Sequence, residues 1–112
     1  MTRQELINLV LKNTNSYEDF PFNDNTREKI LWTAIRQKRN KKIIALIFEK
    51  DNDLLIDLKL APEHGEEVRE YDGVFPGYHM NKTHWNTVRV NNTSLPLEDL
   101  IKMIQESDKL TQ

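Results

Sequence analysis

The densest group of side chains able to do chemistry lies between residues 77 and 88. Its members are two histidines, a tyrosine, a lysine, a tryptophan and an asparagine: Tyr78, His79, Lys82, His84, Trp85 and Asn86. Such groups hold small ligands or lie on nucleic acid, because they combine ring surface with hydrogen-bonding atoms. They also serve structure alone, with the tryptophan in the core and the polar groups satisfying backbone atoms of a turn. The residues leave both interpretations open.

We expect this stretch to form a β-hairpin. Residues 78–80 and 84–90 have the composition of strands, and residues 81–83 that of a turn. His79 and His84 would then face each other, with Lys82 projecting from the tip. Strand alternation places Trp85 on the face opposite His84. A zinc site at the two histidines lacks a third ligand, and the chain has no cysteine, so we expect no bound metal.

A second distinctive stretch spans residues 36–42, in which five of seven residues are cationic and none is acidic. The cations are Arg36, Lys38, Arg39, Lys41 and Lys42. The stretch separates two predicted strands, so we expect a basic hairpin tip suited to phosphates, where cations displace condensed counterions. The alternative is a solvated turn whose charges keep the protein soluble and block edge pairing.

The sequence contains no recognisable catalytic constellation. The serines lack a nucleophile-elbow context, and the three glycines form no phosphate-binding loop. The acidic run at residues 63–72 is typical of a solvated helix face, and we expect His64 to be exposed without a role. We therefore expect no enzymatic activity and no cofactor.

The elements that must position these groups follow from hydrophobic periodicity. A helix begins after Thr2, with Glu5 completing a capping box. Residues 16–26 have loop composition, with an apolar plug over the core at residues 20–22. Strands are predicted at 30–36, 42–50 and 54–60, the second buried on both faces because its apolar run is nearly continuous.

The second half of the chain contains a short helix opened by Pro62, the hairpin described above and a last helix that begins near Pro96. The order is α-β(3)-α-β(2)-α. It predicts an α+β fold, an antiparallel sheet with helices packed on one face.

Length and composition limit the class of protein. At 112 residues, with 38% hydrophobic and 30% charged residues, the chain is expected to be one globular domain over residues 1–112. The net charge of −2 excludes a protein coated in positive charge. No apolar run suits a signal peptide or a membrane span, so we expect a cytoplasmic monomer without membrane contact.

The segment Gly77-Tyr78-His79-Met80-Asn81-Lys82, followed by His84-Trp85-Asn86-Thr87-Val88, resembles the signature of the MmcQ/YjbR family of small bacterial proteins. Supporting matches are Pro21-Phe22, Lys42 before an apolar strand, Pro62, and residues 96–107, so the resemblance covers nearly the whole chain. The chain departs from the family pattern at Lys41, Leu60-Ala61 and Asp108.

The resemblance implies a frataxin-like (CyaY-like) fold and a "double wing" DNA-binding role. One wing would contact phosphates through Arg36, Lys38, Arg39, Lys41 and Lys42, and the other through His79, Lys82 and His84. Non-catalytic DNA binding is therefore our leading hypothesis.

Two other hypotheses remain. One is a module that binds a small molecule or a protein partner in a pocket near Tyr78, His79, Trp85 and Asn86. The other is iron binding by analogy with the fold, which needs an acidic ridge. The first helix and the loop after it supply only four acids, Glu5, Glu18, Asp19 and Asp24.

Overall fold

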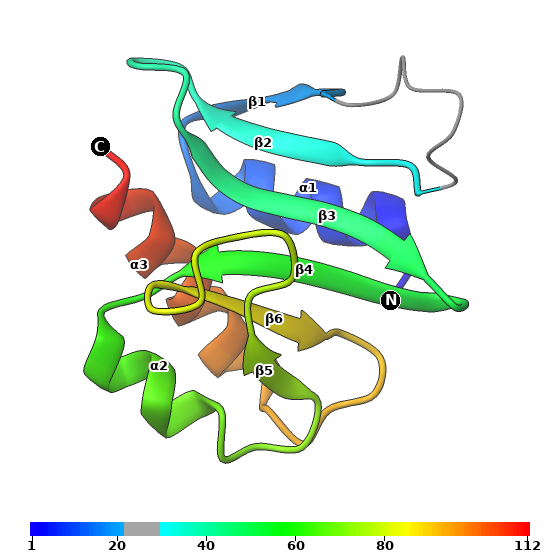
Figure 1. The fold of residues 1–112 in the computed structure, drawn as a ribbon. Helices are drawn as coiled ribbons and strands as arrows, with labels where there is room; N and C mark the ends of the chain where they lie inside the picture. Colours follow the sequence, from blue (N-terminus) through cyan, green and yellow to red (C-terminus); the bar gives the residue numbers. More distant parts are fainter. Residues whose placement is uncertain (22–29) are drawn as a thin grey trace.

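A six-stranded antiparallel sheet forms the centre of the protein, with three helices around it (Figure 1). The computed structural model describes residues 1–21 and 30–112. The matches and expectations that fall on residues 22–29, among them Phe22 and Asp24, lie outside the described residues. No helix in the described part of the chain is long and apolar enough to cross a membrane.

The strands are joined mainly by short turns. Their order across the sheet is β1-β2-β3-β4-β6-β5, and every neighbouring pair is antiparallel. Their bounds are β1 Ser16–Asp19, β2 Thr33–Gln37, β3 Ile43–Lys50, β4 Asp53–Lys59, β5 Val74–Pro76 and β6 Trp85–Arg89. The helices are α1 Arg3–Asn13, α2 Pro62–Val68 and α3 Leu97–Leu110.

Two segments were assigned the wrong type of structure, and the strand predicted at 30–36 begins only at Thr33. Ser16–Asp19, expected within a loop, is the edge strand β1 and pairs with β2. Its four residues carry no apolar alternation, so only the pairing defines it as a strand. Residues 78–80 are not a strand. The strand that precedes β6 in the chain and pairs with it is β5, Val74–Pro76. His79 has φ of 61°, in the left-handed region that strands do not use.

Helices α1 and α3 cover one face of the sheet (Figure 1). The capping box of α1 is confirmed, since Glu5 N–H donates to Thr2 Oγ1 at 3.1 Å and Thr2 N–H donates to Glu5 Oε1 at 2.9 Å. The core beneath these helices takes side chains from the strands at alternate positions, among them Ile35, Ala45, Ile47, Ile56, Leu58 and Val88.

The opposite face of the sheet has a smaller aromatic core. It contains Trp32, Ala34, Leu46, Phe48 and Leu55. The loop between β5 and β6, residues 77–84, folds back across this face and adds Tyr78 and Met80 (Figure 1). Strand β3 is therefore buried on both faces, as predicted. Phe20 does not form the predicted plug, because 56% of its surface is exposed.

Candidate functional site

The turn between β2 and β3 displays four exposed cations, Lys38, Arg39, Lys41 and Lys42. The turn is tight, because Gln37 N–H donates to Lys42 O at 2.8 Å and Lys41 N–H donates to Gln37 O at 2.9 Å. None of the four cations forms an ion pair with another described residue. Their charges are therefore held on a short, ordered turn and remain available to a partner.

Arg36 is placed differently from the other cations of this stretch. Its Nε lies 2.7 Å from Asp19 Oδ2, and its Nη1 donates to Lys41 O at 2.9 Å. The side chain is half-buried and joins β1 to β2. Its charge is already paired with a carboxylate, so Arg36 stabilises the backbone of the basic turn and is not one of its exposed cations.

Two further lysines stand at the same end of the molecule. Lys12 and Lys109 are exposed in the last turns of α1 and α3. Both helix ends meet the basic turn, because Lys38 N–H donates to Asn15 O at 3.2 Å and Asn40 Nδ2 donates to Thr111 O at 2.9 Å.

We call this surface the basic end and define it as Lys12, Lys38, Arg39, Lys41, Lys42 and Lys109. Sequence reasoning missed the two helical lysines, because their positions far along the chain give no sign that they meet the turn. A lysine in the last turn of a helix also has a local explanation, since it complements the helix dipole.

Loop 77–84, expected to be a projecting hairpin, is closed upon itself. Lys82 Nζ donates to Gly77 O at 2.9 Å, and Trp85 N–H donates to Asn81 O at 2.9 Å. Arg69 Nη2 donates to Lys82 O at 2.6 Å from outside the loop. Because residues 78–80 do not pair with β6, the cross-strand register expected to set His79 against His84 does not form.

An aromatic stack connects the loop to the sheet. The His79 ring centroid lies 4.1 Å from that of Tyr78 and 5.3 Å from that of Trp32, both edge to face. Tyr78 stacks on Phe48 at 5.6 Å, and Lys50 Nζ lies 4.4 Å above the Tyr78 ring. Such contacts each contribute about 0.5–1.5 kcal/mol beyond burial, so the stack holds the loop against the sheet.

The residues of the alternative pocket do not all come together. Trp85 and Asn86 are consecutive on β6 and therefore point to opposite faces. Asn86 is fully buried, and its Oδ1 accepts a hydrogen bond of 2.7 Å from Arg69 Nε. Tyr78 and His79 belong to the loop face. Tyr78 lines a cavity of about 300 Å³ together with residues outside the predicted set: Lys50, Asp51, Asp53, Leu55, Phe75 and Arg89.

A buried carboxylate lies beneath loop 77–84. Asp57 on β4 is 0% exposed, and its Oδ1 accepts a hydrogen bond from the Thr87 hydroxyl. Within the described part of the chain, its Oδ2 has no hydrogen-bond partner. Burial raises the pKa of Asp57 to about 7, against the opposing effects of the Thr87 hydrogen bond, the Lys82 charge and the nearby backbone N–H of Tyr78. Apolar and polar residues alternate along residues 54–60, which predicts that Asp57 lies on an exposed polar face of the strand. This prediction is wrong, because the covering loop is distant in sequence and leaves no mark on the pattern.

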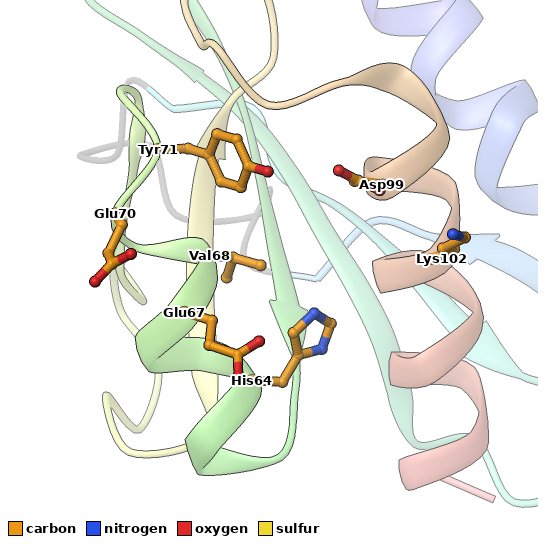
Figure 2. Close-up of a pocket in the computed structure, with 7 residues that line it drawn as sticks. All are labelled: His64, Glu67, Val68, Glu70, Tyr71, Asp99 and Lys102. Carbon is orange, nitrogen blue, oxygen red and sulfur yellow. The ribbon is translucent and has the colours of Figure 1, made fainter.

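A cleft of about 490 Å³ separates α2 from α3 (Figure 2). Its lining residues are His64, Glu67, Val68, Glu70, Tyr71, Asp99 and Lys102. His64 is not fully exposed, contrary to the expectation. The side chain is half-buried, and its Nδ1 lies 2.9 Å from Glu106 Oε1. Glu106 Oε2 in turn accepts from Ala61 N–H at 2.9 Å, so Glu106 fixes the ring at the mouth of the cleft.

The ionisable groups were also considered as metal ligands. Among the residues that the structure describes, no three His, Cys, Asp or Glu side chains are grouped to hold a metal ion. Of the four carboxylates considered for iron binding, the three that the structure describes do not form a group that could hold a metal ion either. Glu5 caps α1, and Asp19 on β1 pairs with Arg36 on β2.

Comparison with known proteins places the chain in a family. The YjbR family model matches residues 11–109. The protein YyaQ of Bacillus subtilis (strain 168) is 25% identical over 100% of this chain and 99% of its own length. The protein YjbR of Escherichia coli (strain K12) is 32% identical over 68% of this chain and 64% of its own length.

Solved structures have the same architecture. A crystal structure of a Pseudomonas syringae protein superposes with a TM-score of 0.82 at 30% identity, covering 100% of both chains. A Deinococcus radiodurans protein superposes with a TM-score of 0.76 at 30% identity, covering 97% of this chain and 77% of its own. With the family model spanning most of the chain, the protein belongs to the YjbR family.

Proposed function

We propose that this protein binds duplex DNA without catalysis, through phosphate contacts made by the basic end. The observation that carries the proposal is the convergence of exposed cations from three separate elements, α1, the β2–β3 turn and α3, none of which is ion-paired with another described residue. A patch that spans several elements is a stronger indication of nucleic-acid binding than a single basic turn.

The charge balance of the whole chain supports the same proposal. The net charge is −2, yet six cations gather at one end, so the protein is strongly polarised. A polarised charge distribution orients the molecule toward a polyanion during encounter. Because the four cations of the turn are not paired with acids, binding them to phosphate breaks no ion pair within the described residues.

Loop 77–84 supplies the second, weaker contact in this proposal. Lys59 at the end of β4 pairs with Trp85 at the start of β6, and the β2–β3 turn lies at the same end of the sheet. We propose that one duplex contacts both surfaces. Lys82 must exchange Gly77 O for a phosphate, and His79 and His84 contribute hydrogen bonds. This arrangement is the double wing of the proposal, with a turn and a folded loop in place of two hairpins.

Two finer features belong to the proposal. The placement of α1 and α3 on one face of an antiparallel sheet supports a frataxin-like arrangement. A monomer in the cytoplasm, where bacterial DNA lies, fits both the absence of cysteine from the sequence and the proposed ligand.

The test is fluorescence anisotropy of a labelled duplex at low and near-physiological salt. If six phosphates are neutralised, the logarithm of the binding constant falls with the logarithm of salt concentration with a slope of about −5. Lys38→Glu should weaken binding at least tenfold at low salt. Lys102→Glu makes the same charge change at the α2–α3 cleft and should leave affinity within about twofold. Equal losses in the two variants, or no binding by wild type at low salt, would refute the proposal.

The α2–α3 cleft favours a second candidate function, the binding of a small molecule. Its volume of about 490 Å³ lies within the range of ligand sites, and His64 is fixed at its mouth (Figure 2). Chemical-shift mapping with a library of small polar fragments tests this candidate. Shifts at His64 and Tyr71 that vanish in Tyr71→Ala would support it, whereas a library that moves neither residue would remove it.

A further inference from the structure

The buried carboxylate of Asp57 is an unusual group to find beneath a surface loop. Asp57 is 0% exposed, and Oδ2 has no hydrogen-bond partner among the described residues. A buried polar atom without a partner is destabilising, and a buried ionised carboxylate in that state is more so. The site is therefore suited to the neutral form of the acid.

A chain of hydrogen bonds links this carboxyl group to loop 77–84. Tyr78 N–H donates to Thr87 Oγ1 at 2.8 Å, and the Thr87 hydroxyl donates to Asp57 Oδ1. Thr87 Oγ1 thus donates its only proton to Asp57 and accepts the hydrogen bond from the Tyr78 N–H. Any change at Asp57 is transmitted through one hydroxyl group to the backbone at the start of the loop.

The groups that face Asp57 come from three elements. Leu46 on β3 and Thr87 on β6 are its register partners, and Tyr78 and Lys82 come from the loop. Leu46 is apolar, and neither the Thr87 hydroxyl nor the Tyr78 backbone carries a charge. Among the residues that the structure describes, Lys82 supplies the one charge that acts on the pKa of Asp57. Its ammonium is bound to the neutral Gly77 carbonyl, an acceptor that a carboxylate can displace.

We propose that Asp57 is a proton-operated switch for loop 77–84. With the proton bound, the carboxyl group is neutral, and the loop is closed with Lys82 on Gly77 O, as observed. When the proton leaves to solvent, Oδ2 becomes a buried anion, and Lys82 moves from Gly77 O to pair with it. The loop then loses the contact that joins its first residue to its sixth.

The switch operates near neutral pH. Burial raises the pKa of Asp57 to about 7, so both forms are populated around neutrality. The aromatic stack of Tyr78 and His79 on Trp32 is carried by the same loop. We therefore expect the stack to shift together with Lys82. The proposal does not depend on DNA binding, because its evidence and its test concern the free protein.

The test is NMR of the wild-type protein between pH 5 and 9. The side-chain carboxyl ¹³C signal of Asp57 should titrate with a midpoint near 7. The amide signals of Tyr78, Lys82 and Thr87 should move with the same midpoint. An Asp57 signal that titrates near 4, or one that titrates near 7 while these amides stay still, would overturn the proposal.

Three variants separate the switch from other titrations. Asp57→Asn keeps the acceptor for Thr87 but cannot ionise, so the amide titration should disappear. Lys82→Met removes the charge that lowers the pKa, so the Asp57 midpoint should rise by a measurable fraction of a pH unit. His79→Gln/His84→Gln removes the two imidazoles of the same loop, and the midpoint should persist. If the amide titration disappears with the histidines instead, the switch is not Asp57.

Discussion

Asp19 and Arg36 form an ion pair of 2.7 Å between β1 and β2, which separates Arg36 from the exposed cations that follow it. Arg36 and Lys38 are only two residues apart in sequence and carry the same charge, but their surroundings differ. One is half-buried against a carboxylate, and the other is exposed on a turn. This difference gives the first prediction.

We expect Arg36→Gln to reduce mainly the stability of the protein, and Lys38→Gln to reduce mainly its DNA binding. Arg36→Gln loses the ion pair and the bond to Lys41 O, so it should reduce the free energy of unfolding by about 1 kcal/mol, because the pair is partly exposed. Lys38→Gln should leave stability within about 0.5 kcal/mol and reduce the salt slope of DNA binding by about one.

Urea unfolding and anisotropy salt titrations of the two variants measure these effects. Asp19→Asn is the matched control, because it breaks the same ion pair without removing a cation. A reduced salt slope in Arg36→Gln, with unchanged stability, would show that Arg36 contacts phosphate and not Asp19.

The second prediction concerns the stability of the protein as a function of pH. The pKa of Asp57 is about 7 in the folded protein, against about 3.9 for an aspartate in an unfolded chain. Between these values the unfolded chain is ionised while the folded protein keeps its proton. The folded state binds more protons there, so the stability falls as pH rises from about 4 to 7, by about 4 kcal/mol in total.

Urea denaturation at half-unit steps from pH 4 to 9 checks this prediction, with Asp57→Asn as the reference. Two other carboxyl groups, Glu5 and Asp53, have lowered pKa values, and their contribution has the opposite sign at more acidic pH. The difference between wild type and variant removes them. A difference that stays constant across the range would show that the folded-state pKa of Asp57 is ordinary.

The third prediction is that Gly77 cannot carry a side chain. A Cβ at this position would lie 2.8 Å from Trp85 Cβ and 2.9 Å from Trp85 O. Gly77 N–H also donates to Trp85 O at 2.8 Å, so the backbone cannot move away freely. Gly77→Ala should reduce the free energy of unfolding by about 1–3 kcal/mol.

Thermal unfolding followed by circular dichroism measures this loss. Thr83→Ala is a suitable control in the same loop, because its side chain is exposed and it should change stability by less than about 0.5 kcal/mol. Equal stability of Gly77→Ala and wild type would mean that the loop does not lie against Trp85.

The fourth prediction concerns the buried Ser107 on α3. Its hydroxyl donates to Ile44 O at 2.6 Å and accepts from Lys59 N–H at 2.9 Å, which ties the helix to β3 and β4. Ser107→Ala leaves both backbone groups without this partner and should reduce stability by about 1–3 kcal/mol. Hydrogen exchange of the Lys59 amide should speed up in the variant, whereas unchanged protection there would contradict the prediction.

Much of the fold is predictable from local patterns. The continuous apolar run of β3 and the capping box of α1 each report burial or hydrogen bonding within one segment, and both are confirmed. The alternation in β4 predicts a strand buried on one face, but the structure buries both of its faces. By contrast, β1 has no such pattern, because its hydrogen bonds to β2 define it. The strand expected at residues 78–80 was wrong because aromatic residues there pack on Trp32 and Phe48 instead of pairing.

The candidate sites divide in the same way. The sequence by itself determined that cations cluster at residues 38–42 and that reactive side chains cluster at residues 77–86, because both are contiguous runs. Only the tertiary structure decided that Arg36 is paired, that Lys12 and Lys109 join the basic end, and that Asp57 is buried under a loop. Pairing, convergence and burial depend on residues distant in sequence. Composition and periodicity report local preference and carry no information about such contacts.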